Sequence, residues 1–349
     1  MVPPLPLIYD LDYPQLAAKI TAWGEPEYRA RQIWRCLYAN YWNNPTDSRQ
    51  FTNLPSIFRQ RLSAEFSFKA LSPTKSIESA DKSTIKILFT LKDGTAIETV
   101  LMRYNQRRTL CISTQVGCAM DCVFCATGQM GYKRNLSSGE IVEQVLFFAR
   151  KLADLNERVT NVVIMGMGEP FHNYDATLAA IDRLNQSNGF NLGARHFTIS
   201  TVGLVPKIRQ FADEMRQINL AISLHAASDP ERQKLIPISK KYPLSQLIQA
   251  SHYYVEKTHR RITFEWALIQ GVNDSVEEAR RLAQLLKGLL CHVNIIPLNP
   301  TREYSGQATT RESVESFRSE LEKAGIPCTV RLRRGIEIQA GCGQLASNQ

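Results

Sequence analysis

Short apolar segments alternate with amphipathic helices from about residue 107 onward. Six segments are predicted as strands: TLCISTQ, NVVIMGMG, HFTISTV, NLAISLH, ITFEWALI and VNIIPLN. A seventh strand-like run, CTVRLRR (328–334), follows the last helix, and helices are predicted at 138–155, 243–258 and 276–290. Repeated strand–helix units favour a parallel sheet with right-handed crossovers. Such units fit an α/β fold with an incomplete (β/α)6 barrel, and a doubly wound open sheet is the alternative.

The residues before this region follow two other patterns. Residues 1 to about 75 are predicted to be helical, with helices near 26–42 and 58–66 that are rich in arginine and aromatic residues. Most of the aromatic side chains should form a small core, whereas the arginines stay free to meet phosphate groups. Residues 83–104 contain two strand-like runs around KDGT, and Asp-Gly is a strong hairpin signal. In the second run, Glu98 shares a face with apolar residues, although exposed carboxylates are common on strands.

These patterns divide the chain into four parts. They are a basic helical module (1–80), a β-hairpin extension (81–106), the strand–helix region (107–336) and a C-terminal tail (337–349).

The chain carries 42 Lys and Arg against 33 Asp and Glu, a formal charge of +9. This excess suits a polyanionic partner such as nucleic acid, and a basic housekeeping enzyme is the simpler reading. No apolar run is long enough to span a bilayer, and the first residues lack a signal peptide's basic and apolar regions. We therefore expect a cytoplasmic protein without membrane contact. Clustered cysteines then point to metal binding or catalysis rather than to disulfide staples.

Three cysteines, Cys118, Cys122 and Cys125, form a C-x3-C-x2-C motif directly after the first predicted strand. Parallel α/β folds place their active sites at this end of the strands. Three thiolates suit a zinc ion or an iron–sulfur cluster, but no fourth cysteine or histidine lies at zinc-knuckle spacing. The spacing, with Phe124 before the third cysteine, is similar to the signature of radical S-adenosylmethionine (SAM) enzymes. In those enzymes a [4Fe-4S] cluster leaves one iron open to SAM.

Small polar residues follow the other predicted strands. The second strand leads into GMGEP (166–170), which resembles the GGEP motif of radical SAM enzymes except at Met167. Each of these residues could be a helix cap, and His225 alone would more often be a core histidine. Together they predict one SAM-binding mouth at the carboxyl ends of the strands. The predicted cofactor-binding residues are Gly168, Glu169, Ser200, Ser223, Leu224, His225 and Asn299.

Two further cysteines stand apart from the cluster motif. Cys111 lies inside the first predicted strand, where it could be a small buried hydrophobe. Cys342 lies in the tail between two glycines, which let a backbone bend close to a site. Nothing in the sequence places Cys36, Cys291 or Cys328 near the chemistry, so they are expected to be small buried hydrophobes.

The chain resembles the RlmN family of dual-specificity 23S rRNA and tRNA adenine carbon-2 methyltransferases. The resemblance runs nearly end to end, through PEYRARQIWRCLY, IETVLMRY, RTLCISTQVGCAMDCVFCATG, VIMGMGEP, TISTVGLVP, AISLHA, IPLNP and RRGIEIQAGCGQL. It implies a radical SAM barrel, catalytic roles for Cys111 and Cys342, and a proton-accepting role for Glu98. It also implies two SAM molecules per turnover, an S-methylcysteine on Cys342 and a transient disulfide with Cys111.

Partners follow from the same resemblance. They are 23S rRNA and tRNA, gripped in part by the basic N-terminal module, and an electron donor such as flavodoxin or ferredoxin. A monomer is expected. The nearest alternative is a carbon-8 adenine methyltransferase of the antibiotic-resistance type, which shares the cysteine set. More distant alternatives are an enzyme that activates a glycyl radical protein and an RNA-binding protein with a structural zinc site.

Overall fold

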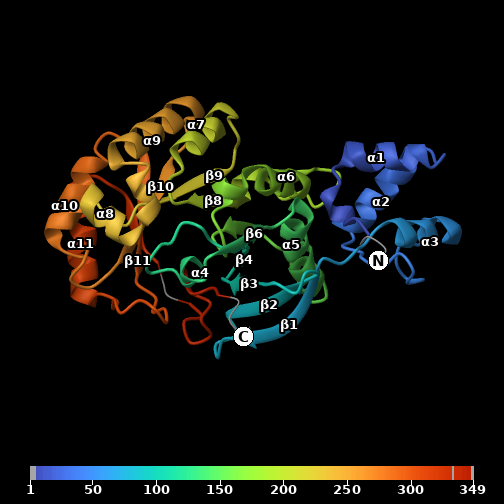
Figure 1. Ribbon diagram of the computed structural model, residues 1–349, viewed down its shortest axis with the longest axis horizontal. Helices are drawn as coiled ribbons and strands as arrows, with labels where there is room; N and C mark the ends of the chain where they lie inside the picture. Colours follow the sequence, from blue (N-terminus) through green and yellow to red (C-terminus); the bar gives the residue numbers. More distant parts are fainter. Residues whose placement is uncertain (1–4, 332–333, 347–349) are drawn as a thin grey trace.

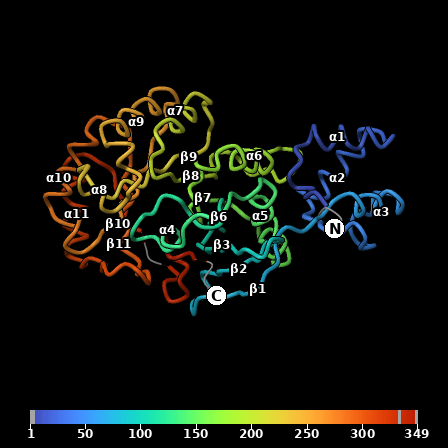
Figure 2. The backbone as a smooth tube through the Cα atoms, viewed as in Figure 1, coloured from blue at the N-terminus to red at the C-terminus, as the bar shows by residue number. Residues whose placement is uncertain are grey.

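The computed structural model describes residues 5–331 and 334–346, and a ten-stranded sheet organises it (Figures 1 and 2). Its parallel strands are β4 (Arg108–Cys111), β7 (Asn161–Ile164), β8 (Phe197–Thr201), β9 (Asn219–Ser223), β10 (Ile262–Leu268), β11 (Cys291–Pro297) and β12 (Cys328–Val330). They confirm the first six strands predicted from the sequence; of the seventh predicted run, 328–334, β12 covers the first three residues, and 332–333 lie outside the described residues.

The strand order excludes the doubly wound alternative. The parallel strands follow one another in chain order from β4 to β12, so the winding never reverses at a switch point. Among the described residues, β4 pairs with β3 and β7, and β12 pairs with β11. The sheet therefore curves as an incomplete barrel and does not close.

Helices between the strands cover the outer side of the curved sheet (Figure 1). They are α5 (Ser138–Ala153), α6 (Tyr174–Asn185), α7 (Val205–Asp213), α8 (Asp229–Leu235), α9 (Leu244–Thr258), α10 (Val276–Leu285) and α11 (Arg311–Lys323). Ser137 begins α5 with a reciprocal capping box, and the Ser275 side chain caps α10. The three helices predicted between the strands are confirmed to within a few residues.

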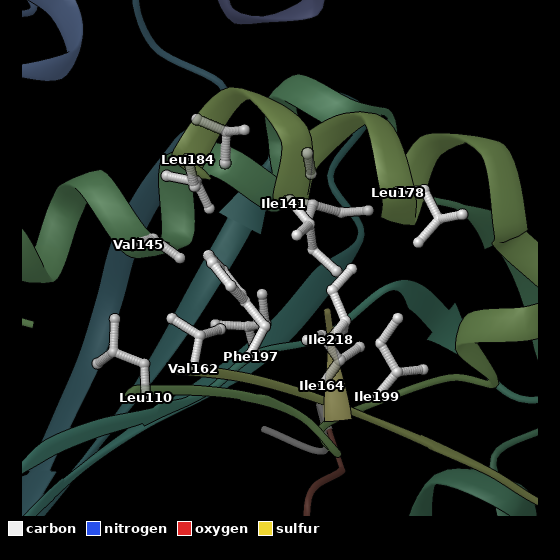
Figure 3. Packing of buried hydrophobic residues seen from close by; sticks show 14 of the residues in the cluster. Leu110, Ile141, Val145, Val162, Ile164, Leu178, Leu184, Phe197, Ile199 and Ile218 are labelled. Atoms are coloured by element: carbon white, nitrogen blue, oxygen red, sulfur yellow. The ribbon is translucent and has the colours of Figure 1, made fainter. Parts of the chain in front are cut away.

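Side chains along each parallel strand point alternately to the two faces of the sheet, which separates the core from the site. Figure 3 shows Leu110, Val162 and Phe197 of three parallel strands pointing toward Val145 of α5 and Leu184 of α6. Because side chains alternate across a strand, the intervening residues point to the opposite, concave side of the sheet. In β8, for example, Phe197, Ile199 and Thr201 are buried while Thr198 and Ser200 are half-buried.

An antiparallel extension precedes the barrel. Strands β2 (Thr84–Leu91) and β3 (Ala96–Arg103) form the predicted hairpin, and β3 pairs with β4. Strand β1 (Leu71–Glu78) pairs with β2 at the sheet edge, so the helical prediction is wrong for residues 71–75. Its side chains are nearly all exposed, so the strand leaves no apolar alternation in the sequence to detect.

The N-terminal helices lie at the opposite end of the molecule from α10 and α11 (Figure 1). They are α1 (Tyr13–Ala22), α2 (Tyr28–Tyr38) and α3 (Ser56–Glu65). Trp34 and Tyr38 are buried, as expected for core aromatics, whereas Tyr28 is exposed. No helix in the described part of the chain is long and apolar enough to cross a membrane.

Candidate active site

The three motif cysteines lie in a loop that is held at both ends. The loop runs between the paired strands β5 (Gln115–Gly117) and β6 (Tyr132–Asn135) and contains α4 (Ala126–Gln129). The Gln129 side chain donates to the Val123 carbonyl at 2.7 Å, and the Val123 N–H donates to Leu235 of α8 at 3.1 Å. A Cβ atom on Gly117 would lie 1.8 Å from the Gly131 carbonyl oxygen, so only glycine fits this strand pair.

Cys118, Cys122 and Cys125 line one cavity of about 140 Å³. Burial raises the pKa of the Cys118 thiol to about 12, and burial and the other two cysteines raise that of Cys122 well above its usual value. Thiols like those of Cys118 and Cys122 become thiolates only beside strong positive charge, which iron would supply.

The three cysteines line the same cavity, as ligands to different irons of one cluster would. In the part of the chain that the structure describes, no three His, Cys, Asp or Glu side chains converge to hold one metal ion. A structural zinc site needs convergent ligands, whereas each cysteine of a [4Fe-4S] cluster binds a different iron.

The carboxyl ends of the parallel strands supply the rest of this cavity. Its lining includes Gly168 and Glu169 after β7, Ser200 in β8, Ser223 and His225 at the end of β9, and Asn299 after β11. The structure therefore brings together six of the seven predicted cofactor-binding residues. Leu224 does not line the cavity: its side chain is fully buried, and its N–H donates to the Glu265 carbonyl at 3.1 Å.

Glu169 is a buried carboxylate that joins two strand ends. Its side chain accepts from the N–H groups of Phe171, at 3.0 Å, and Val202, at 2.9 Å. Burial raises its pKa to about 7, and the hydrogen bonds oppose that rise. Gly168 has φ +102°, and a Cβ there would lie 2.5 Å from Gln115 Cβ. The glycine therefore lets Gln115 accept from the Glu169 N–H at 2.8 Å.

Met167, where the sequence departs from the GGEP pattern, does not face the cavity. Its side chain is fully buried, and its sulfur accepts from the N–H of Glu98 at 3.3 Å. The departure therefore falls on the packing between β7 and β3 and leaves the cavity unchanged.

His225 is held neutral and in one orientation. Its backbone is left-handed (φ 59°), and its Nδ1 accepts from the Ala267 N–H at 2.8 Å. Burial, assisted by the charge of Arg232, lowers its pKa to about 3. The ring packs edge-on against Phe124 of the cysteine loop, with centroids 4.8 Å apart. His225 therefore links the β9 end to the cluster motif as a fixed neutral imidazole.

The C-terminal tail closes over this cavity and brings Cys342 into its lining. In Figures 1 and 2 the red tail lies between α4 and the hairpin. Asn299 donates to the Cys342 carbonyl at 3.0 Å, and the Ala126 N–H donates to Gly343 at 2.8 Å. A Cβ on Gly341 would lie 2.8 Å from Asn299 Nδ2. The glycine therefore permits the close approach predicted from the sequence.

Cys342 also lines a second, smaller cavity of about 30 Å³ with Cys111. Cys111 ends β4 and is half-buried, whereas Cys342 is exposed. Burial raises the pKa of Cys111 to about 12, and desolvation of its sulfur by the surrounding protein raises that of Cys342. The other three cysteines line neither cavity: Cys36, Cys291 and Cys328. The structure therefore pairs Cys111 with Cys342 and leaves those three apart.

Glu98 of β3 contacts the C-terminal tail outside the two cysteine cavities. Its carboxylate pairs with Lys86 at 2.9 Å and accepts from the Ala346 N–H at 3.0 Å, while Lys86 donates to the Gln339 carbonyl at 3.1 Å. Burial raises the pKa of Glu98, and Lys86 lowers it. Glu98 lines a third cavity of about 560 Å³ with Lys86, Lys133 and Arg302, outside the lining of the two cysteine cavities.

Two residues of the site escaped the sequence analysis. Lys86 is one, because nothing in its hairpin strand indicates a partner 253 positions away. Arg331 is the other, in the lining of the smaller cavity. The run CTVRLRR suggested only a strand, and three arginines close together gave no reason to select one.

Comparison with known proteins agrees with this geometry. The Radical SAM superfamily model matches residues 112–283. A crystal structure of a radical SAM methyltransferase from Sphaerobacter thermophilus superimposes with a TM-score of 0.96 at 46% identity, covering 99% of this chain and 100% of that one. Fold and site thus define a radical SAM methyltransferase.

Curated relatives show which family of radical SAM methyltransferases is similar to this chain. The probable dual-specificity RNA methyltransferase RlmN of Geobacillus kaustophilus is 49% identical over 99% of this chain and 94% of its own length. The dual-specificity RNA methyltransferase RlmN 1 of Myxococcus xanthus is 49% identical over 97% and 93%. The chain belongs to the RlmN family of dual-specificity RNA methyltransferases. This membership excludes the glycyl-radical and zinc-protein alternatives.

Proposed function

We propose that this enzyme methylates carbon 2 of an adenosine in 23S rRNA, and of the adenosine 3′ to the anticodon in some tRNAs. One observation carries the proposal: Cys342 lines both the cavity of the cluster motif and the cavity of Cys111. A methyl carrier must meet SAM on one side and a resolving thiol on the other. The position of Cys342 meets both requirements.

The radical SAM family implies SAM and a [4Fe-4S] cluster, and the residues present suit both. Cys118, Cys122 and Cys125 would hold three irons of the cluster. Glu169 and its neighbours at the strand ends would hold SAM. When bound, the cluster and SAM supply radical chemistry, which carbon 2 needs because it lies between two ring nitrogens and is a poor nucleophile.

The chain's own residues then carry the methyl group. The Cys342 thiolate would take a methyl from a first SAM, forming a sulfur–carbon bond and releasing S-adenosylhomocysteine. A second SAM would be used to remove one hydrogen atom from that methyl group, and the methylene would join carbon 2. To restore the aromatic ring, the adduct must lose the carbon-2 proton to a base and one electron, for which the oxidised cluster would be the acceptor.

Release of the product requires Cys111. Its thiolate would attack the Cys342 sulfur and form a disulfide, while the sulfur–methylene bond breaks. The electron pair of that bond goes to the carbon, which takes a proton and becomes the methyl group. A two-electron thiol reductant, available in the cytoplasm, would reset the disulfide.

Glu98 is the candidate acceptor of the carbon-2 proton. Its buried position raises its pKa, which suits a base, but Lys86 and Ala346 already occupy its oxygens. We propose Glu98→Gln as the test. A fall in turnover of at least a hundredfold with tail position retained supports the base role, and unchanged turnover removes it.

RNA would approach the polar side of the tail, because Lys86, Lys133 and Arg302 line the third cavity there. The overall charge of +9 and the exposed arginines of the N-terminal helical module suit the phosphate backbone. The target adenine must leave its stack to reach Cys342, which is easiest in a loop. We propose that the enzyme works as a monomer with a flavodoxin or ferredoxin as its electron donor.

The decisive experiment uses Cys111→Ala expressed in cells, with Cys328→Ala as the matched control. RNA attached to Cys342 is sought by denaturing gel and mass spectrometry. An adduct in Cys111→Ala alone supports both cysteine roles, and sequencing the RNA identifies the substrate. Unmodified Cys342 contradicts the proposal. Mass spectrometry of digested RNA from the wild type separates carbon 2 from carbon 8 as the methylated position.

A further inference from the structure

Arg331 places a positive charge beside the two cysteines of the smaller cavity. It follows β12, the last parallel strand, and its N–H donates to the Ile295 carbonyl at 2.8 Å. Cys111 ends β4, the first parallel strand. Both residues nevertheless line the same cavity, together with Cys342 of the tail. The curvature of the incomplete barrel thus brings a cation from its last strand to a thiol from its first.

Two other charged side chains lie near Arg331: Arg334 lines the same cavity, and Glu265 lines the larger one. Arg334 stacks over the Tyr104 ring at 4.7 Å and donates to the Arg103 carbonyl at 3.2 Å. Glu265 of β10 is buried and accepts from Asn294 at 2.9 Å; burial raises its pKa, and the charge of Arg331 opposes that rise.

Arg331 acts on both sulfurs. Burial raises the pKa of Cys111, the neighbouring Cys342 raises it further, and Arg331 lowers it. Arg331 also lowers the pKa of Cys342, against burial and Glu265.

We propose that Arg331 is a positioning residue that holds Cys111 as the reactive thiolate for release of the methylated base. The role rests on the function proposed above, because it assists the attack of Cys111 on the Cys342 sulfur. In that step a sulfur–sulfur bond forms and the sulfur–methylene bond breaks, so two sulfurs are oxidised and the carbon is reduced. Only the thiolate attacks, and a half-buried cysteine without a nearby cation stays a thiol.

The test measures the reactivity of Cys111 directly. The anaerobic holoenzyme, whose cluster cysteines are protected by iron, is treated briefly with iodoacetamide between pH 8 and 10. Labelling of the Cys111 peptide is followed by mass spectrometry. Arg331→Gln should slow this labelling about tenfold at each pH, equivalent to about one pKa unit. Arg331→Lys should slow it less than about threefold, because the charge is retained.

Two controls separate charge from structure. Arg334→Gln removes a cation from the same cavity and should leave Cys111 labelling unchanged. Labelling of Cys291, which is buried outside both cysteine cavities, should be the same in every variant and reports intact folding. Equal labelling of Cys111 in Arg331→Gln and the wild type overturns the inference. An equal loss in Arg331→Lys and Arg331→Gln, with Cys291 still protected, also overturns it, because shape rather than charge would then matter.

A second measurement keeps this inference separate from the proposed function. Arg331→Gln expressed in cells should accumulate RNA on Cys342 above the wild-type level and below that of Cys111→Ala. An adduct in Cys111→Ala but none above wild type in Arg331→Gln overturns the inference and leaves the function intact. If neither variant forms an adduct, the proposed function fails while the labelling experiment still decides the role of Arg331.

Discussion

The ends of the parallel strands and the C-terminal tail form the candidate site in different ways. The strand ends repeat one arrangement, because each strand stops at the same edge of the sheet and leaves a polar group there. The described part of the tail, residues 337–346, contains no helix or strand. Side chains and loops from α4, β2, β3 and the segment after β11 hold it instead. Regular backbone thus builds the cofactor cavity, and separate long-range contacts place the reacting sulfur.

The largest effect is expected from a substitution that removes the cluster from the strand-end half of the site and leaves the tail in place. Cys122→Ala should abolish the iron–sulfur cluster and methylation, because the remaining two cysteines of the motif cannot hold it. Iron content, visible absorbance and RNA methylation are the measurements. Cys291→Ala, a core change outside both cysteine cavities, should keep its iron. Full cluster loading in Cys122→Ala would contradict the assignment.

Breaking the buried ion pair between Lys86 and Glu98, which contacts the tail, should have the next largest effect. Lys86→Met leaves the Glu98 carboxylate buried without its partner and removes the donor to Gln339. The free energy of unfolding should fall by about 3–5 kcal/mol in urea titrations. Lys133→Met, an exposed change at the same cavity, should stay within about 0.5 kcal/mol of the wild type. Equal stability of the two variants would show that the pair does not hold the tail.

In the strand-end half of the site, Glu169 should make the free energy of unfolding depend on pH. Its pKa in the folded protein, about 7, lies above the ordinary 4.5, so folding favours the protonated form. That stabilisation is present below pH 4.5 and is lost as the pH rises toward 7. Glu169→Gln should shrink the difference in unfolding free energy between pH 5 and pH 8 by on the order of 2–3 kcal/mol. Urea titrations of the SAM-free enzyme check this, and an unchanged difference would contradict it.

Substituting one glycine in the strand-end half and one in the tail compares the two halves of the site most directly. Gly166→Ala would put a Cβ 2.6 Å from the Ile112 carbonyl oxygen, so we expect a loss of about 1–3 kcal/mol in stability. Gly341→Ala would press on Asn299 and displace Cys342, so methylation should fall while stability changes by less than about 1 kcal/mol. Gly193→Ala, which makes an ordinary 3.4 Å contact, serves as the control. A stability loss in Gly341→Ala as large as in Gly166→Ala would remove the distinction between the halves.

Much of the strand-end half was predictable from the sequence. Short apolar segments between amphipathic helices identified the parallel strands described here, and the polar residues that follow several of them lie in one cavity because parallel strands share an edge. Strand β1 was missed because its exposed side chains follow no apolar pattern. Leu224 was grouped with its neighbours Ser223 and His225, although its side chain packs away from the cavity.

What the sequence by itself determined is the set of local patterns: the strand–helix repeat, the C-x3-C-x2-C loop, and the glycines on either side of Cys342. These depend on neighbouring residues and on backbone geometry, so they can be read along the chain. Only the tertiary structure decided that Cys111 and Cys342 share a cavity, that Lys86 and Glu98 hold the tail, and that Arg331 lies beside both sulfurs. Cys111 lies 231 residues before Cys342 and 220 before Arg331, and Lys86 and Glu98 contact tail residues 253 and 248 positions away. Cys111 and Arg331 meet only because the sheet curves enough to bring its first and last parallel strands to the same opening.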